Sequence, residues 1–182
     1  RIDGSGRLLL GTTTEGEASA DDLTIAGSGN QGITIRSGTS NYGLIYFSDA
    51  TSGTGEYDGA IEYKHSDNFM VFRTGASERL RIDSSGRLLL GTTTEGYSSA
   101  DDLTVSTSGA TGITIRSGTS NTGTLAFSDG TSGADEYRGY IQYEHQNDAL
   151  AFASNGTQRL RINSVGQISI RGTSTAFDTT GD

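Results

Sequence analysis

The chain has 182 residues and is acidic, with 22 Asp and Glu against 13 Lys and Arg and a formal net charge of -9 at pH 7. This charge argues against nucleic-acid partners and anionic membrane surfaces, which attract basic faces. The chain has no cysteine, which excludes disulfides, thiolate zinc sites and cysteine nucleophiles. No apolar run approaches the roughly 20 residues of a membrane-spanning helix, so no membrane insertion is expected. With 27 Gly and no Pro, we expect β-structure with many glycine turns.

Three short strands are predicted near the start of the chain, at Leu8–Leu10 (LLL), at Leu23–Ile25 (LTI) and at residues 33–36 (ITIR). Each has apolar residues at alternate positions, which is typical of a half-buried strand. Residues 12–22, TTTEGEASADD, fit a loop or one short helical turn before the second strand.

Four strands and a closing LLL follow, giving about seven strands for each module. They are predicted at residues 44–49, 60–65, 70–72 and 80–82, and the next LLL lies at residues 88–90. Turns are expected at residues 66–68, 74–77 and 84–86, and Gly6, Gly75, Gly86 and Gly156 are the turn glycines. Short strands joined by tight turns predict an antiparallel meander, and no stretch shows helical periodicity.

The sequence repeats. Residues 1–80 align with residues 81–160 without a gap and are identical at 49 of 80 positions. Residues 161–170 begin a third copy, which keeps Arg161, Ile162, Ser164 and Gly166. An ungapped period of this length indicates one supersecondary module repeated in series. We therefore expect β repeats at 1-80 and 81-160, with 161-182 as an incomplete third repeat or terminal segment.

Comparison of the copies predicts which strand face points inward. Phe47 and Phe127 match, whereas Tyr46 is replaced by Ala126, which indicates period-two alternation. The middle residue of LLL, Leu9 or Leu89, becomes Ser169 in the third copy, so we expect it to be less buried than its neighbours. The predicted core side chains are Leu8, Leu10, Ile33, Ile35, Phe47, Ile61, Tyr63, Phe72, Leu80, Ile82, Leu88, Leu90, Phe127, Ile141, Tyr143, Phe152, Leu160 and Ile162, and Leu23, Ile25, Ile45 and Met70 belong to the same inward set.

So few apolar positions make a thin core for each module. Small domains of this kind need disulfides, metal ions or oligomerisation. Disulfides are impossible here and the sequence offers no plausible metal cage, so we expect several chains to pool their apolar faces. A closed assembly would also cover exposed strand edges, which otherwise favour aggregation.

Several motifs together resemble the shaft repeats of bacteriophage tail fibres, which are trimeric fibre modules, and most closely those of phages of aquatic bacteria. The motifs are GITIRSGTSN, FSDGTSG, Y-x-G-x-I-x-Y-x-H (residues 137–145), NGTQRLRI (residues 155–162) and RIDSSGRLLLGTT. The resemblance covers residues 1–170. It implies an elongated, homotrimeric, all-β shaft: an extracellular virion component that supports host attachment. Similar modules also occur in bacterial adhesive fibres.

The recurring histidines His65 and His145 are the metal candidates. If their face met a threefold axis, three imidazoles would surround a transition-metal ion. The alternative is a histidine hydrogen-bonded beside Tyr63 or Tyr143, and we expect no metal and no cofactor.

No enzyme site is expected either. The adjacent Asp21 and Asp22 would point to opposite faces of an extended chain, whereas glycosidase carboxylates lie about 5–10 Å apart across a sugar. The recurring Asp101–Asp102 pair is interpreted in the same way, as turn-forming and solvated. A calcium site near Asp58 is disfavoured because the second copy has Arg138 there.

Repeated charges on the outer strand faces predict cross-strand or inter-chain ion pairs. They are Arg36/Arg116, Arg79/Arg159, Arg81/Arg161, Asp3/Asp83 and Glu15/Glu95.

Together with the resemblance, the sequence implies a structural fibre protein of a phage virion, not an enzyme, whose partners are further copies of itself, other virion proteins and host glycans. The alternative is an extracellular adhesive fibre or carbohydrate-binding module of bacteria, in which Tyr42, Tyr46, Tyr57 and Tyr97 would contact sugars.

Overall fold

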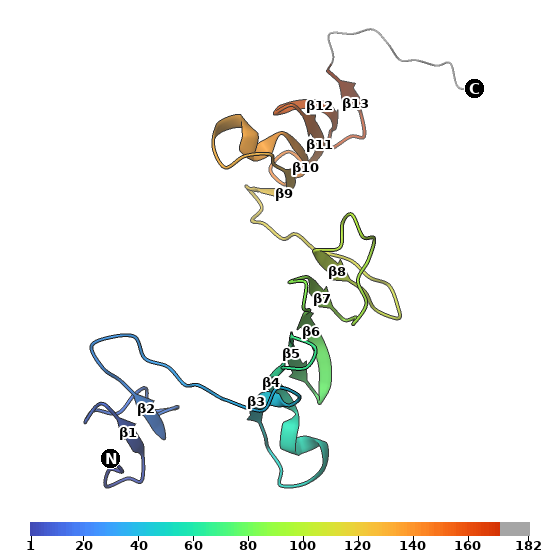
Figure 1. Ribbon diagram of the computed structural model, residues 1–182. Coiled ribbons are helices and arrows are strands. Elements are labelled where there is room, and N and C mark those ends of the chain that lie inside the picture. Colours follow the sequence, from blue (N-terminus) through green and yellow to red (C-terminus); the bar gives the residue numbers. More distant parts are fainter. Residues whose placement is uncertain (172–182) are drawn as a thin grey trace. The chain divides into compact units, whose positions relative to one another are not determined.

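The computed structural model describes residues 1–171 (Figure 1). These residues are mostly β-strand in predominantly antiparallel sheets, and helix is limited to two short 3-10 turns, η1 (Gly53–Tyr57) and η2 (Gly133–Tyr137). The predicted all-β class is confirmed. The chain divides into two compact units, Arg1–Thr111 and the part from Gly112 onward.

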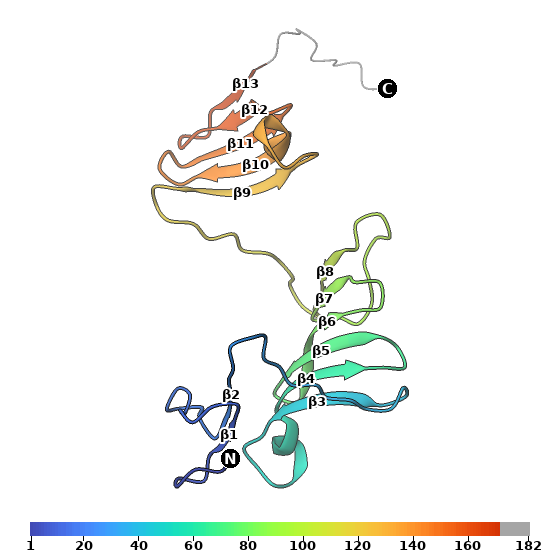
Figure 2. The ribbon, with the colours of Figure 1, turned by 60° about the vertical axis from the view of Figure 1, so that its left-hand side comes forward.

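The larger sheet of the first unit has six strands in sequence order (Figure 2). They are β3 (Tyr42–Phe47), β4 (Gly59–Lys64), β5 (Phe69–Thr74), β6 (Ser77–Ile82), β7 (Leu88–Leu90) and β8 (Leu103–Val105). The first five pair antiparallel, as expected from strands joined by tight turns. The register shifts between Phe72 and Arg73 and leaves Arg79 without a partner, which marks a bulge in β6.

The last strand of this sheet differs from the predicted antiparallel order, because β8 pairs parallel to β7. The same parallel pair occurs earlier, between β1 (Leu8–Leu10) and β2 (Leu23–Ile25). Parallel neighbours need a crossover of about a dozen residues, and residues 11–22 and 91–102 supply it. The crossover is a loop, held where the Gly16 N–H donates to Thr24 Oγ1 at 3.0 Å.

The second unit repeats the meander with five strands. They are β9 (Thr122–Phe127), β10 (Gly139–Glu144), β11 (Ala149–Ser154), β12 (Thr157–Ile162) and β13 (Ile168–Ile170). Its register is that of β3–β7 displaced by 80 residues, so that Leu125 faces Ile141 as Ile45 faces Ile61.

The sequence boundaries at residues 80 and 160 fall inside β6 and β12. A periodic sequence can be divided at any phase, so the sheets and the sequence copies begin at different points of the same period. Residues 172–182 of the expected third segment lie outside the described residues.

The hairpin between β5 and β6 turns through two residues with positive φ, as its counterpart in the second sheet does. Asn155 and Gly156 have φ of 54° and 66°, and Gly75 and Ala76 have 56° and 53°. Two-residue hairpins favour such turns because their twist matches the strands. The predicted turn glycines Gly6 and Gly86 also have positive φ.

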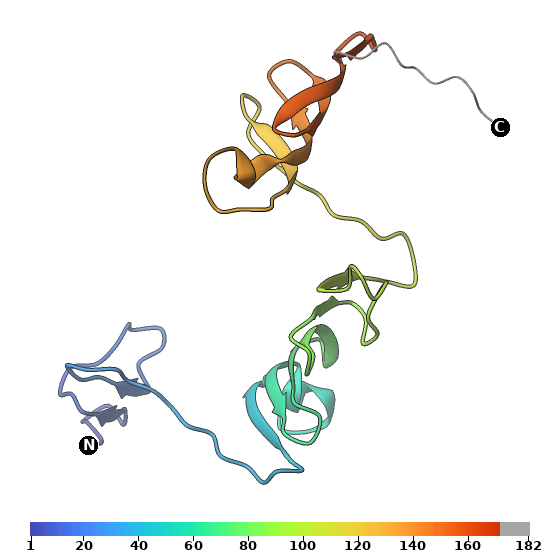
Figure 3. The ribbon, with the colours of Figure 1, turned by 45° about the horizontal axis from the view of Figure 1, so that its top comes forward.

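Two expectations from sequence are wrong for the single chain. Residues 33–36 and 113–116, which we call the ITIR segments, are not strands. They belong to the unpaired connections between β2 and β3 and between β8 and β9 (Figure 3). Leu9 and Leu89 are only 1% exposed, although the substitution by Ser169 predicted lower burial.

The buried side chains of the single chain lie on the sheet face opposite the predicted one. They are Leu9, Ala60, Val71, Leu89, Ala149 and Ala151, joined by the polar Glu62. Leu89 lies beside Thr104, whose hydroxyl accepts a hydrogen bond from the crossover residue Gly96, so the crossover loop covers it. The third copy has no described crossover, and Ser169 is exposed there.

Candidate functional site

One face of the first sheet consists mainly of apolar side chains that remain accessible. Side chains alternate between the faces of a strand, and the cross-strand register places Ile61 between Ile45 and Phe72. We call this surface the apolar face; it contains Gly43, Ile45, Phe47, Gly59, Ile61, Tyr63, Met70, Phe72, Leu80, Ile82, Leu88, Leu90, Leu103 and Val105. Phe47 is 61% exposed. Contiguous exposed apolar surface of this kind marks an interaction site.

The second sheet carries the same apolar face. Its members are Gly123, Leu125, Phe127, Gly139, Ile141, Tyr143, Leu150, Phe152, Leu160, Ile162, Ile168 and Ile170. Leu125 is 51% exposed and Phe127 57%. The pair β1–β2 adds Leu8, Leu10, Leu23 and Ile25 from equivalent positions. The surface therefore recurs wherever the module recurs.

All the core side chains predicted from sequence lie on these apolar faces, except Ile33 and Ile35 in the first ITIR segment. None of them is buried within the single chain. Ile61, Tyr63, Leu80, Leu88, Leu160 and Ile162 are half-buried, and Leu8, Leu10, Ile33, Ile35, Phe47, Phe72, Ile82, Leu90, Phe127, Ile141, Tyr143 and Phe152 are exposed. Their burial in an assembly stays a prediction.

A shallow groove crosses the apolar face where the ITIR segment meets the sheet. In the first sheet it has a volume of about 260 Å³, and its lining includes Ile35, Gly43, Tyr63 and Met70. The second sheet has an equivalent groove of about 390 Å³. Ile35 lies close to Gly43, since a Cβ at this glycine would be 3.7 Å from Ile35 Cγ2, which is ordinary van der Waals contact.

His65 and His145 each lie at the end of this groove against a tyrosine ring. The ring centroids of Tyr63 and His65 are 5.0 Å apart in an edge-to-face arrangement, and Tyr143 and His145 match them. The Tyr63 hydroxyl donates to Asn68 Oδ1 at 3.1 Å. No three His, Cys, Asp or Glu gather closely enough to hold a metal ion within residues 1–171. Each histidine thus lies beside the tyrosine that the sequence suggested, but the contact is an edge-to-face packing of the rings and not the expected hydrogen bond.

The opposite face of each sheet carries ion pairs, and the two copies form these pairs with different residues. In the first sheet Arg81 donates to both carboxylate oxygens of Glu78, at 2.7 and 2.9 Å. The second copy has Gln158 in place of Glu78, and Arg161 donates instead to Glu144 at 2.6 Å. Glu144 stands where the first copy has a lysine, so the reversed charge supplies the partner that the arginine has lost.

A second difference between the copies removes an ion pair completely. Glu62 is 7% exposed and pairs with Arg73 across 3.0 Å. The second copy has Gln142 and Ala153 at these positions. Removing one member alone would leave a buried charge without a partner, which explains why both differ together. The charged side chains that form these pairs therefore have their partners within the same sheet.

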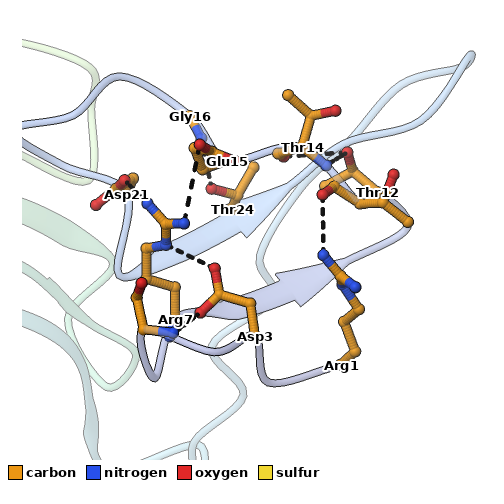
Figure 4. A network of polar contacts seen from close by, with 11 residues as sticks. Arg1, Asp3, Arg7, Thr12, Thr14, Glu15, Gly16, Asp21 and Thr24 are labelled. Atoms are coloured by element: carbon orange, nitrogen blue, oxygen red, sulfur yellow. Dashed lines mark hydrogen bonds and ion pairs between the residues drawn. The ribbon is translucent and has the colours of Figure 1, made fainter.

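An arginine cluster fixes the crossover loop to the parallel strand pair (Figure 4). Arg7 contacts Asp3 and Asp21, each at 2.7 Å, and Glu15 at 3.8 Å. Hydrogen bonds from the Arg7 backbone and side chain hold the pKa of Asp3 below its ordinary value. The sequence singled out Asp3 and Glu15 but missed Arg7 and treated Asp21 as solvated.

The same cluster recurs around Arg87, which lies 2.7 Å from Asp83 and 2.8 Å from Asp101. Desolvation acts to raise the pKa of Asp83, but hydrogen bonds from the Arg87 side chain and backbone hold it below its ordinary value.

The third copy replaces this cluster with a neutral pair. Asn163 Nδ2 donates to Gln167 Oε1 at 2.9 Å. The sequence also has Thr175 and Gly181 where the two downstream acids would stand. The arginine and its acids thus disappear together, and this joint loss is the sequence signal that could have identified the cluster.

The tyrosines proposed as sugar contacts are accessible. Tyr97 is 75% exposed, and Tyr42 is 39% exposed. Tyr46 and Tyr57 form an exposed aromatic pair, with ring centroids 6.2 Å apart. The second copy has Ala126 in place of Tyr46, so this pair belongs to the first sheet alone.

Within residues 1–171, no helix has the length and apolarity needed to cross a membrane. No known family model matches the chain, and the comparison with curated proteins finds no relative.

Proposed function

We propose that the chain is a structural module of a homotrimeric, β-structured fibre shaft, of the tail-fibre kind, that supports attachment of a bacteriophage to its host. The observation that carries the proposal is the apolar face, which recurs on both sheets and remains accessible in a single chain. Phe47 and its counterpart Phe127 are 61% and 57% exposed. Covering this surface needs a partner.

The partner is a second copy of the chain, because the apolar face recurs with the 80-residue period of the sequence. A partner that covers both faces must present complementary surface at the same interval, and a second copy does so. Three sheets placed around one axis would each turn an apolar face inward and an ion-paired face outward. The outer face carries charges that are already satisfied within each sheet, as in the Glu62–Arg73 pair, and this keeps the shaft soluble.

The experiment is a mass measurement at equilibrium over a range of concentrations, combined with negative-stain electron micrographs of the same sample. The proposal expects three times the chain mass of 19.0 kDa and particles that are rods. A compact monomer that persists at micromolar concentration would refute it.

A second candidate function is binding of surface glycans, favoured by the exposed Tyr46–Tyr57 pair. Aromatic rings that are accessible on one side are suited to contact the apolar side of a sugar. A glycan array probed with the assembled protein tests this function. Binding that is lost in Tyr46→Ala and kept in Tyr97→Ala would support it, and no binding to any glycan would exclude it for the array tested.

A further inference from the structure

The ITIR segments lie in a stretch that is nearly identical in the two copies. Residues 31–40 and 111–120 are identical at nine of ten positions. Yet in the described chain no N–H or C=O of either ITIR segment bonds to another backbone group. These exposed N–H and C=O groups are therefore free to pair with the backbone of another chain.

The side chains of the ITIR segments alternate as those of a strand do. Ile33 and Ile35 are 69% and 47% exposed, and their counterparts Ile113 and Ile115 are 71% and 51% exposed. Period-two apolar alternation is the pattern of a strand with one covered face. The sequence therefore encodes a strand, and the single chain lacks the neighbour that would pair with it.

A buried hydroxyl directly after each segment also lacks a partner. Ser37 Oγ and Ser117 Oγ are the only buried side-chain polar atoms without a hydrogen-bond partner among the described residues. Leaving a buried donor unpaired is costly. The same unpaired hydroxyl recurs directly after the segment in both copies.

Each large sheet also has a free edge next to its ITIR segment. The strand order places β3 at the edge of the first sheet and β9 at the edge of the second. An edge strand presents a row of unpaired N–H and C=O groups, which accept an added strand. Each ITIR segment is thus followed in the chain by a strand whose outer edge is unpaired.

The charges at these two places are complementary. Arg36 and Arg116 are exposed and take part in no ion pair or side-chain hydrogen bond of the described chain, although Arg36 was expected to pair. Glu56 in η1 and its counterpart Glu136 in η2 recur in the same unpaired state. η1 packs beside β3, since Tyr57 contacts Tyr46. In both copies, therefore, an unpaired arginine on the ITIR segment is matched by an unpaired glutamate in the 3-10 turn beside the edge strand.

We propose that the ITIR segments are strands donated to a neighbouring copy: residues 33–36 of one chain add to the free edge of β3 in the next chain, and residues 113–116 add to β9. The proposal rests on the proposed trimer and assigns its backbone contacts. Donor and acceptor are different surfaces, so the contact is heterologous, and a heterologous contact closes into a ring when its rotation allows. Three chains exchanging strands in this way form a closed ring that leaves neither the ITIR segments nor the β3 edges unpaired.

Hydrogen exchange measured on the full chain tests the backbone pairing. In the assembled protein, the alternate amides of residues 33–36 that face β3, and the outward amides of β3, should exchange at least about 100-fold more slowly than in an unstructured peptide. Amides of residues 27–29 in the same connection should exchange freely. An oligomer in which residues 33–36 also exchange freely would overturn strand donation and leave the trimer intact. If residues 33–36 are protected but the outward amides of β3 are not, β3 is not the acceptor strand. A protein that stays monomeric would overturn both proposals.

A matched pair of variants tests the side chains. Ile33→Ser combined with Ile113→Ser should raise the dissociation constant of the oligomer by about tenfold or more, since these side chains are covered only by a neighbour. Val165→Ser is the control, because Val165 is 75% exposed and lies in a turn outside the donated segment. The circular dichroism of both proteins should match the parent. Equal dissociation constants for the two variants would count against strand donation.

Discussion

Replacing Phe72 with serine should weaken assembly much more than it disturbs the sheet. The Phe72 side chain is 37% exposed in the single chain, so about a third of its surface is left for a partner to bury. Since complete burial of a phenylalanine stabilises by up to about 3 kcal/mol, that third contributes roughly 1 kcal/mol per chain and about 3 kcal/mol per trimer. At about 1.4 kcal/mol for each factor of ten, the trimer dissociation constant should rise roughly 100-fold.

Sedimentation equilibrium on dilution series measures this change directly. Lys64→Ser is the control on the opposite face and should leave the dissociation constant within about threefold. Val71→Ser is the control for folding, because Val71 is adjacent in sequence but 0% exposed in the single chain. It should remove the first sheet's contribution to the β-sheet signal in circular dichroism, whereas Phe72→Ser should retain it.

The face assignment is refuted if Phe72→Ser and Lys64→Ser have equal, negligible effects on the dissociation constant. It is refuted as well if Phe72→Ser unfolds the protein as completely as Val71→Ser does. Either result would mean that the accessible face is not the one that assembles.

Three further predictions concern the sheets themselves. Ala76→Gly should raise the free energy of unfolding in urea by about 0.5–1 kcal/mol, because relief of the left-handed alanine exceeds the entropy cost of glycine; a decrease would show that the turn is not strained. Arg87→Gln should speed hydrogen exchange of the β8 amides about tenfold, because three acids lose their shared cation, whereas Arg79→Gln, whose guanidinium donates to the Thr74 carbonyl, should leave β8 unchanged. Lowering the pH should destabilise the second sheet, because hydrogen bonds from Arg161 and then Asn147 hold the pKa of Glu144 below its ordinary value of 4.5. That stabilisation is complete above pH 4.5 and is lost as the pH falls through the lower folded-state pKa. Urea midpoints at pH 7 and pH 3 should therefore differ less in Glu144→Gln than in the parent, and equal differences would contradict the assignment.

The sequence was sufficient to predict most of the strands and the face on which their apolar side chains lie. Alternation and hairpin turns are local properties, and the two copies acted as each other's control, as where Phe47 matches Phe127 while Tyr46 becomes Ala126. The hairpin at Asn155–Gly156 followed from its residues alone, since both adopt positive φ readily.

The tertiary structure decided which groups are satisfied within one chain. The parallel pairing of β7 with β8 and the burial of Leu89 beneath the crossover loop depend on how distant segments meet, and Ser169 was misleading because its copy has no described crossover. The arginine cluster at Arg7 likewise joins residues that are far apart along the chain. The ITIR segments also depend on their neighbours. Their alternating apolar residues are typical of a strand, but a strand forms only where another strand is present to hydrogen-bond with it. Local sequence sets what a segment is suited to become, and the position of its neighbours determines whether it becomes so.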